Sequence, residues 1–191
     1  WGLAQLGAAP PARLLAALSG QACRVADTFK TQELSSLFWA VAKLGGTVDP
    51  AFLRAAARRA AQLEPELTRP AEVAGLLWAL ATIGSPLGPD AMDALTNSAA
   101  RLADRMDAEM LVKTHWALAR LRHRPAPGDM QQIVGAARRL ADELPADDRL
   151  TVMHAWGVLR TNPGDDVIRV YTAEFRGDGE DTGTEEGGGT P

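Results

Sequence analysis

The sequence contains few of the residues that stabilise secreted domains or build metal centres. It has a single cysteine, Cys23, and aromatic side chains make up 5% of its 191 residues. One thiol forms neither an intramolecular disulfide nor a cysteine zinc site, so we do not expect a disulfide-stabilised secreted protein. We expect Cys23 to be a small buried apolar side chain. No apolar run reaches the roughly 18 residues of a membrane span, which predicts no membrane partner.

Motifs for catalysis and cofactor binding are also missing. The sequence has no phosphate-binding loop, dinucleotide glycine fingerprint, nucleophile elbow or His-Glu-x-x-His zinc motif. The histidines, His115, His123 and His154, are expected to be packed or surface residues. The acid pairs 147–148 and 165–166 fall at expected helix starts, where carboxylates satisfy free amides. We therefore predict no enzyme activity, no cofactor, no metal and no small-molecule substrate.

The net charge of -4 comes mainly from the C-terminal end of the sequence. Residues 174–191 hold six acids against Arg176, which leaves a near-neutral body with 19 basic and 18 acidic side chains. The charge balance by itself therefore argues neither for nor against a nucleic-acid partner. Residues 177–191 are rich in glycine, acid and threonine, and we predict a disordered acidic tail there.

Tryptophan recurs at an almost constant interval: it stands at positions 1, 39, 78, 116 and 156, and the successive differences are 38, 39, 38 and 40. Each tryptophan opens a related string, of which Trp78-Ala-Leu-Ala-Thr-Ile-Gly84 is the most regular. A period of this length is the signature of stacked repeats, each of which buries its apolar face against its neighbours. We take the tryptophans as the structural signature of the repeat: Trp1, Trp39, Trp78, Trp116 and Trp156.

Each repeat is expected to contain two helices. Around the tryptophan, apolar residues fall at helical spacing, and Gly45, Gly84 and Asn162 stand where a left-handed cap residue is needed. A proline ten or eleven residues after the tryptophan fits the first turn of a second helix. Thr68, Asp107 and Asp147 are expected to cap the next tryptophan helices.

These features predict an all-α fold, a right-handed α-solenoid or superhelix of stacked helix-turn-helix repeats of about 38 residues. Residues 1–176 would form this solenoid, with a partial first repeat and about four further units.

The strings Leu76-Leu-Trp-Ala-Leu-Ala-Thr-Ile-Gly84 and Leu37-Phe-Trp-Ala-Val-Ala-Lys-Leu-Gly45 resemble the octotricopeptide repeat family, over most of residues 1–162. The resemblance implies binding of single-stranded RNA in a chloroplast or mitochondrion, in transcript stability, processing, splicing or translation. It also implies other proteins of a ribonucleoprotein complex as partners. The family often has asparagine three residues before the tryptophan, a position that differs here: Ser36, Gly75, Lys113 and Met153.

On the tryptophan helix, the side opposite the apolar stripe is polar and varies between units. Variable polar side chains on a constant scaffold are what recognition of one base per repeat requires. We expect the lysines and arginines to contact phosphates and the uncharged polar residues to meet base edges. The candidate RNA-binding residues are Gln5, Gln32, Ser36, Lys43, Gly75, Thr82, Lys113, Arg120, Arg149 and Arg160.

Three alternatives remain open from the sequence. A polar face opposite a core stripe is typical of any solvated helix, so a protein-binding scaffold of the same architecture is the rival function. The tryptophans are expected to fill the seam between units rather than to stack on bases. Arg24, Arg101 and Arg139 form a second basic line, which we interpret as solvated charge with a secondary phosphate role.

Overall fold

The structure, a computed structural model, describes residues 2–5, 7, 11–45, 49–173 and 175. Every regular element in these residues is a helix, which confirms the all-α prediction. Trp1 and the predicted tail at 177–191 lie outside the described residues. None of the described helices is long and apolar enough to cross a membrane.

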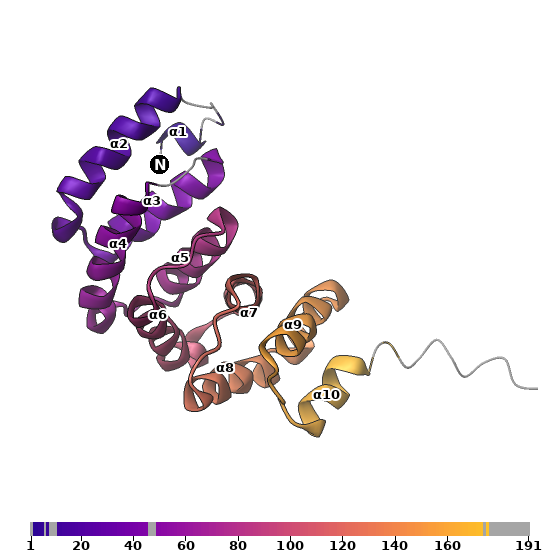
Figure 1. The fold of residues 1–191 in the computed structure, drawn as a ribbon. Helices are drawn as coiled ribbons and strands as arrows, with labels where there is room; N and C mark the ends of the chain where they lie inside the picture. Colours follow the sequence, from indigo (N-terminus) through magenta and orange to yellow (C-terminus); the bar gives the residue numbers. More distant parts are fainter. Residues whose placement is uncertain (1, 6, 8–10, 46–48, 174, 176–191) are drawn as a thin grey trace, which may run out of the picture.

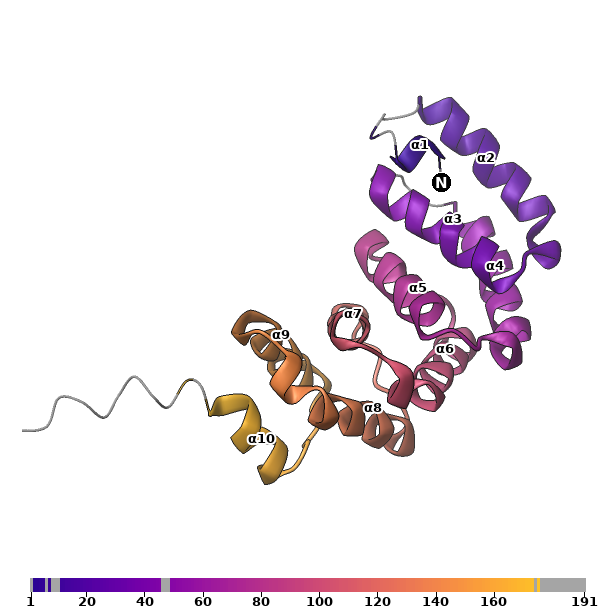
Figure 2. The same cartoon turned by 180° about the vertical axis from the view of Figure 1, so that it is seen from behind.

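The helices form two layers along a curved array (Figure 1). The inner layer contains the odd-numbered helices: α1 (Gly2–Gln5), α3 (Thr31–Leu44), α5 (Pro70–Ile83), α7 (Ala108–Leu121) and α9 (Ala146–Leu159). The outer layer contains the even-numbered helices: α2 (Ala12–Arg24), α4 (Pro50–Leu63), α6 (Pro89–Arg101), α8 (Pro127–Arg139) and α10 (Asp165–Thr172). The reverse view shows the same odd-numbered layer on the concave side (Figure 2).

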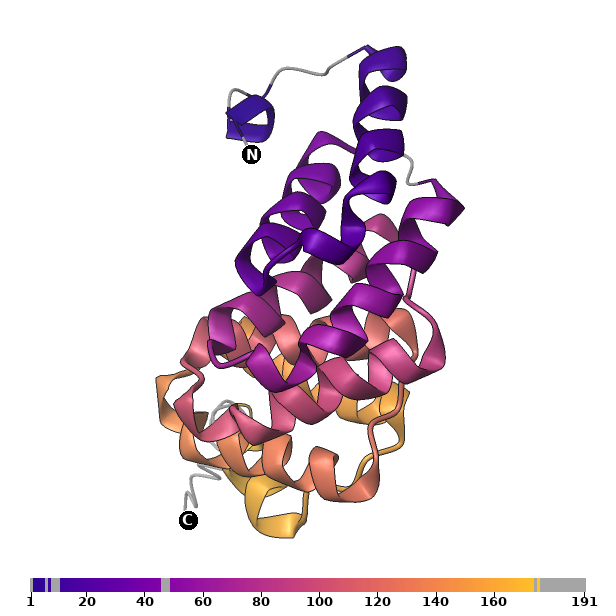
Figure 3. The same cartoon turned by 90° about the vertical axis from the view of Figure 1, so that its left-hand side faces the viewer.

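Helices of each layer pack on the next helix of the same layer. In the inner layer α3 contacts α5, α5 contacts α7, and α7 contacts α9, while α4, α6 and α8 form the corresponding outer row. The inner helices from α3 to α9 begin at positions 31, 70, 108 and 146, so their starts recur almost evenly along the chain. The N-terminal and C-terminal helices consequently lie at opposite ends of the array (Figure 3).

Some of the helix starts agree with the capping residues predicted from the sequence, and others do not. Proline begins α4, α6 and α8, where its missing N–H is not needed. Asp107 caps α7 by accepting a 2.8 Å bond from the Met110 amide, as predicted. The predictions for Thr68 and Asp147 were wrong, because the residues before α5 and α9 are Arg69 and Pro145.

The inner helices from α3 to α9 end in a left-handed residue, but not always a glycine. Gly45 and Gly84 have φ of 63° and 74°, as predicted. In α7 and α9 the same place is taken by Arg122 and Arg160, with φ of 52° and 51°. A β-carbon in this region costs roughly 1–2 kcal/mol. The prediction of Asn162 as the cap of the last tryptophan helix was therefore wrong.

Short 3₁₀ turns join each outer helix to the next inner helix, which the sequence pattern does not predict. They are η1 (Ala26–Thr28), η2 (Glu64–Glu66), η3 (Ala103–Arg105) and η4 (Ala141–Glu143). Arginines of the following outer helix bind carbonyl groups in and next to η2 and η3. Arg101 donates to the Glu64 and Leu67 carbonyls at 3.2 and 3.1 Å, and Arg139 donates to the Ala103 and Met106 carbonyls at 3.2 and 2.9 Å.

These bonds give Arg101 and Arg139 a structural role that the sequence pattern does not indicate. Arg24 differs, since it bonds Gln21 of its own helix. We expect Arg139→Met to lower the free energy of unfolding by about 1–2 kcal/mol, because it keeps the aliphatic stem but leaves two carbonyls without their charged donor. Urea denaturation measures this loss. Arg138→Met, which removes an exposed ion pair with Asp166, is the control and should change stability by less.

Candidate nucleic-acid interface

Seven of the predicted residues lie on one face of the inner helices. Counted from the start of each helix, they occupy the second, sixth and thirteenth positions: Gln32, Ser36, Lys43, Gly75, Thr82, Lys113 and Arg120. All seven are exposed or partly exposed, whereas the fourth, eighth and tenth residues of the same helices are buried. Gln5 in α1 is also exposed. These residues form a row of polar and basic side chains on the inner, concave layer (Figure 1), which we call the concave row.

The last inner helix is out of register with the tryptophan spacing. Tryptophan is the ninth residue of α3, α5 and α7, but in α9 the ninth residue is His154 and Trp156 is the eleventh. The eleventh residues of α5 and α7 are Leu80 and Leu118, which are completely buried. Trp156 is accordingly buried, with 4% of its surface exposed, while His154 is exposed at the tryptophan position.

This shift removes two predicted residues from the row. Arg149 is the fourth residue of α9 and donates from Nε to the Leu144 carbonyl at 3.0 Å, on the side where the other helices bury an apolar residue. Arg160 is the left-handed residue that ends α9. The second, sixth and thirteenth residues of α9 are instead Asp147, Thr151 and Val158.

A slot opens between α3 and α5 on this row. Its volume is about 520 Å³, and its lining includes Gln32, Ser36, Trp39, Gly75, Arg69 and Arg105. The slot is open because the sixth residues of both helices are small. A β-carbon added to Gly75 would meet no atom within 4 Å. At the sixth position of α7, by contrast, Lys113 forms an ion pair with Glu109.

The two arginines beside the α3–α5 slot already have partners. Arg69 lies 3.6 Å from the Glu72 carboxylate, and Arg105 donates to the Thr68 carbonyl at 3.1 Å. Both are exposed, so these weak contacts hold the guanidinium groups near the slot without burying them.

The tryptophans do not all have the same environment. Trp78 and Trp116 are partly buried and pack against the hydrophobic core. Lys43 connects two units, with its ammonium nitrogen 5.8 Å from the Trp39 ring centroid and 5.3 Å from that of Trp78. Trp39 is partly exposed and lines the slot. A partly exposed indole next to a cation is suited to contact with a nucleobase.

A buried polar contact joins α7 to α9. Trp156 donates from Nε1 to Nε2 of His115 at 3.2 Å, and Nδ1 of His115 lies 3.1 Å from the Leu111 carbonyl. Burial lowers the pKa of His115 to about 4, although the Leu111 carbonyl opposes this shift. Tyr171 of α10 packs on the Trp156 ring and donates to the Ala137 carbonyl at 2.9 Å, and burial raises its pKa.

A further, partly buried titratable group outside the concave row is His123. His123 has its Nε2 atom 3.3 Å from the Asp93 carboxylate, without the orientation of a hydrogen bond. Burial lowers the pKa of His123, while Asp93 opposes this shift. Within the described part of the chain, no three His, Cys, Asp or Glu side chains come together as a metal site.

The fold and this row of side chains define the class of protein: an all-helical stack of hairpins that presents a variable polar surface. Residues 2–142 match the family model described as Tbc2 translation factor, N-terminal domain, and the chain belongs to that family. The match includes α1 to α8 and ends before α9, the helix that is out of register. No curated protein matches the chain. The chain is thus a translation-related helical domain.

Proposed function

We propose that the chain is an RNA-binding module of organellar RNA metabolism, in a chloroplast or mitochondrion, and acts on the stability, processing or translation of a transcript. The proposal includes a right-handed α-solenoid built from octotricopeptide-like units of about 38 residues. Two observations support it: the family description as a translation factor domain, and the α3–α5 slot on the concave row.

The α3–α5 slot is the observation that carries the proposal. It combines a partly exposed indole, Trp39, with the polar side chains of Gln32 and Ser36. A base that stacks on an aromatic ring contributes about 1–3 kcal/mol to binding. An amide and a hydroxyl each donate and accept hydrogen bonds, so they are suited to reading a base edge. Arg69 and Arg105 at the rim would face the flanking phosphates.

Filling the slot tests the proposal. We expect Gly75→Leu to weaken binding of random-sequence single-stranded RNA by roughly tenfold or more, because the leucine occupies the volume of the base. The same change should raise stability by about 0.8 kcal/mol, since leucine favours a helix over glycine. Filter binding measures the first effect and urea denaturation the second.

Gly20→Leu is the matched control. Gly20 lies in the outer helix α2, and a β-carbon there would also meet no atom within 4 Å. It should gain similar stability without losing RNA affinity. Equal RNA affinity of the Gly75→Leu and Gly20→Leu variants would show that the slot is not a base site.

A second candidate function is a protein-binding scaffold within a ribonucleoprotein complex. It is favoured by the apolar side chains on the last helix pair, among which Leu150 is 47% exposed and Val158 is 41% exposed. The residue at the position of Leu150 in α5 is Ala74, which is buried. This function would replace RNA binding if the native chain showed no salt-dependent affinity for single-stranded RNA.

A further inference from the structure

The two ends of α7 and α9 carry opposite charge. Four acids against one base, Arg149, lie at their N-terminal ends: Asp107, Glu109, Asp147 and Asp148. At and beyond their C-terminal ends there is a cluster that we name the basic edge: Arg120, Arg122, Arg124 and Arg160. The loops 122–126 and 160–164 contain no carboxylate. A positive charge in the last turn of a helix, such as that of Arg120, is accounted for by its favourable interaction with the helix dipole, but Arg124 lies beyond the last turn of α7.

Two arginines of the basic edge occupy positions that favour glycine. Arg122 and Arg160 have positive φ, where α1, α3 and α5 are followed by Gly7, Gly45 and Gly84. Their side chains are therefore kept at the edge although the backbone there would be more stable with glycine. This points to a use of the side chain outside the helix itself.

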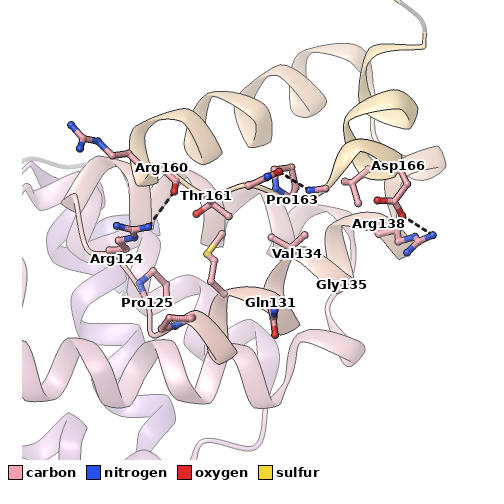
Figure 4. Close-up of a pocket in the computed structure, with 15 residues that line it drawn as sticks. Arg124, Pro125, Gln131, Val134, Gly135, Arg138, Arg160, Thr161, Pro163 and Asp166 are labelled. Atoms are coloured by element: carbon pink, nitrogen blue, oxygen red, sulfur yellow. Dashed lines mark hydrogen bonds and ion pairs between the residues drawn. The ribbon is translucent and has the colours of Figure 1, made fainter.

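The basic edge borders a groove between α8 and the α9–α10 loop. The groove has a volume of about 810 Å³. Its lining includes buried Met130, Val134 and Val167. Figure 4 shows Arg124 and Arg160 at one end of this groove and Arg138 with Asp166 at the other.

The charges at the two ends of the groove differ in how far they are neutralised. Arg138 forms a 2.8 Å ion pair with Asp166. Arg124 donates to the Arg160 carbonyl at 3.2 Å, which holds the two residues together. Among the described residues, no ion pair joins the guanidinium of Arg124 or Arg160 to a carboxylate. One end of the groove thus has two exposed cations, of which Arg124 is held in place by its bond to the Arg160 carbonyl.

We infer that the Arg124–Arg160 end of this groove is a phosphate-binding site, and that it takes the backbone of RNA that leaves the concave row over the C-terminal ends of α7 and α9. The inference rests on the proposed function. Planar guanidinium groups bind phosphate oxygens through paired donors. The acids at the N-terminal ends of α7 and α9 repel a polyanion, which favours the C-terminal ends of these two helices for RNA that leaves the row. Arg120, the thirteenth residue of α7, connects this end to the row.

The test removes the two cations and compares salt dependence. The variant Arg124→Gln with Arg160→Gly leaves the Arg160 carbonyl in place and puts glycine where φ is positive. We expect its slope of log affinity for single-stranded RNA against log salt to fall by about 1.4, the value for two phosphates on a single strand. Its melting temperature should not fall, because Arg160→Gly relieves the backbone. A structural role would predict lower stability instead.

Arg54→Gln with Arg58→Gln is the matched control, since both arginines are exposed on the outer helix α4 and the same charge is lost. Equal salt slopes for the two variants would overturn the inference while leaving the proposed function intact. Titration with inorganic phosphate, followed by the NMR signals of the Arg124 and Arg160 side chains, is independent of RNA. Shifts of both signals support the site, and their absence overturns it. Tighter binding of a polyglutamate peptide than of RNA would overturn the assignment to RNA.

Discussion

Replacing Trp156 with alanine is expected to lower the free energy of unfolding by about 3–5 kcal/mol, the usual range for loss of a buried tryptophan. The indole is 4% exposed, packs 4.8 Å from the Tyr171 ring centroid, and donates its N–H to His115. Its removal leaves a cavity between α7, α9 and α10 and an unpaired acceptor on His115. Urea denaturation followed by circular dichroism measures the loss, because tryptophan fluorescence itself changes with the substitution.

Trp39→Ala is the matched control for this prediction. Trp39 is partly exposed at the concave row, so its loss should cost roughly 1 kcal/mol, as for an average substitution. The order should be reversed for RNA affinity, which should decrease more in Trp39→Ala than in Trp156→Ala. Comparable losses of stability in the Trp39 and Trp156 variants would contradict the register shift of α9.

This contrast shows where the sequence is informative and where it is not. Apolar periodicity and the tryptophan interval suffice to predict helices and their pairing, because each helix must bury one stripe. The numbers of Trp116 and Trp156 differ by 40, whereas α7 and α9, which carry them, begin at 108 and 146, a difference of 38. An indole in the core and an indole at the surface look alike in a sequence. The signal that could have revealed the shift is the distance of the cap from the tryptophan: Gly45, Gly84 and Arg122 lie six residues after theirs, and Arg160 lies four residues after Trp156.

The hydrogen bonds from side chains of one unit to the backbone of the preceding unit could not be predicted from the sequence either. Arg101 and Arg139 recur at the same distance from a tryptophan, which suggested a basic line. Their donors bind carbonyls of the preceding unit, and only the packed 3₁₀ turns bring these groups together. The α3–α5 slot was predictable in part, since Gln32, Ser36 and Gly75 were candidates, but Arg69 and Arg105 were not. They belong to the segments between helices, whose position depends on packing.

The stability of the native chain is expected to fall by about 3 kcal/mol as pH decreases from about 6.5 to about 4, because of His115 alone. The pKa of His115 is lowered to about 4 by burial, from an ordinary value of 6.5. Between these values the unfolded chain binds a proton at His115 and the folded chain does not, so acid favours unfolding. Above pH 6.5 His115 is neutral in both the folded and the unfolded chain, so the stability that is lost in acid is fully present there.

The hydrogen bonds around His115 also predict that stability falls in acid. Its Nδ1–H donates to the Leu111 carbonyl, and its Nε2 accepts from Trp156, so only the neutral ring satisfies both contacts. A second proton on Nε2 would face the indole N–H. The variant His115→Leu with Trp156→Phe replaces both partners by apolar groups. Leucine at the position of His115 has a precedent in α5, whose eighth residue is Leu77. Unfolding free energies measured by urea denaturation across this pH range should fall more steeply for the native chain than for the variant. Parallel curves would mean that His115 is protonated or accessible in the folded state, and the buried contact between α7 and α9 would then be wrong.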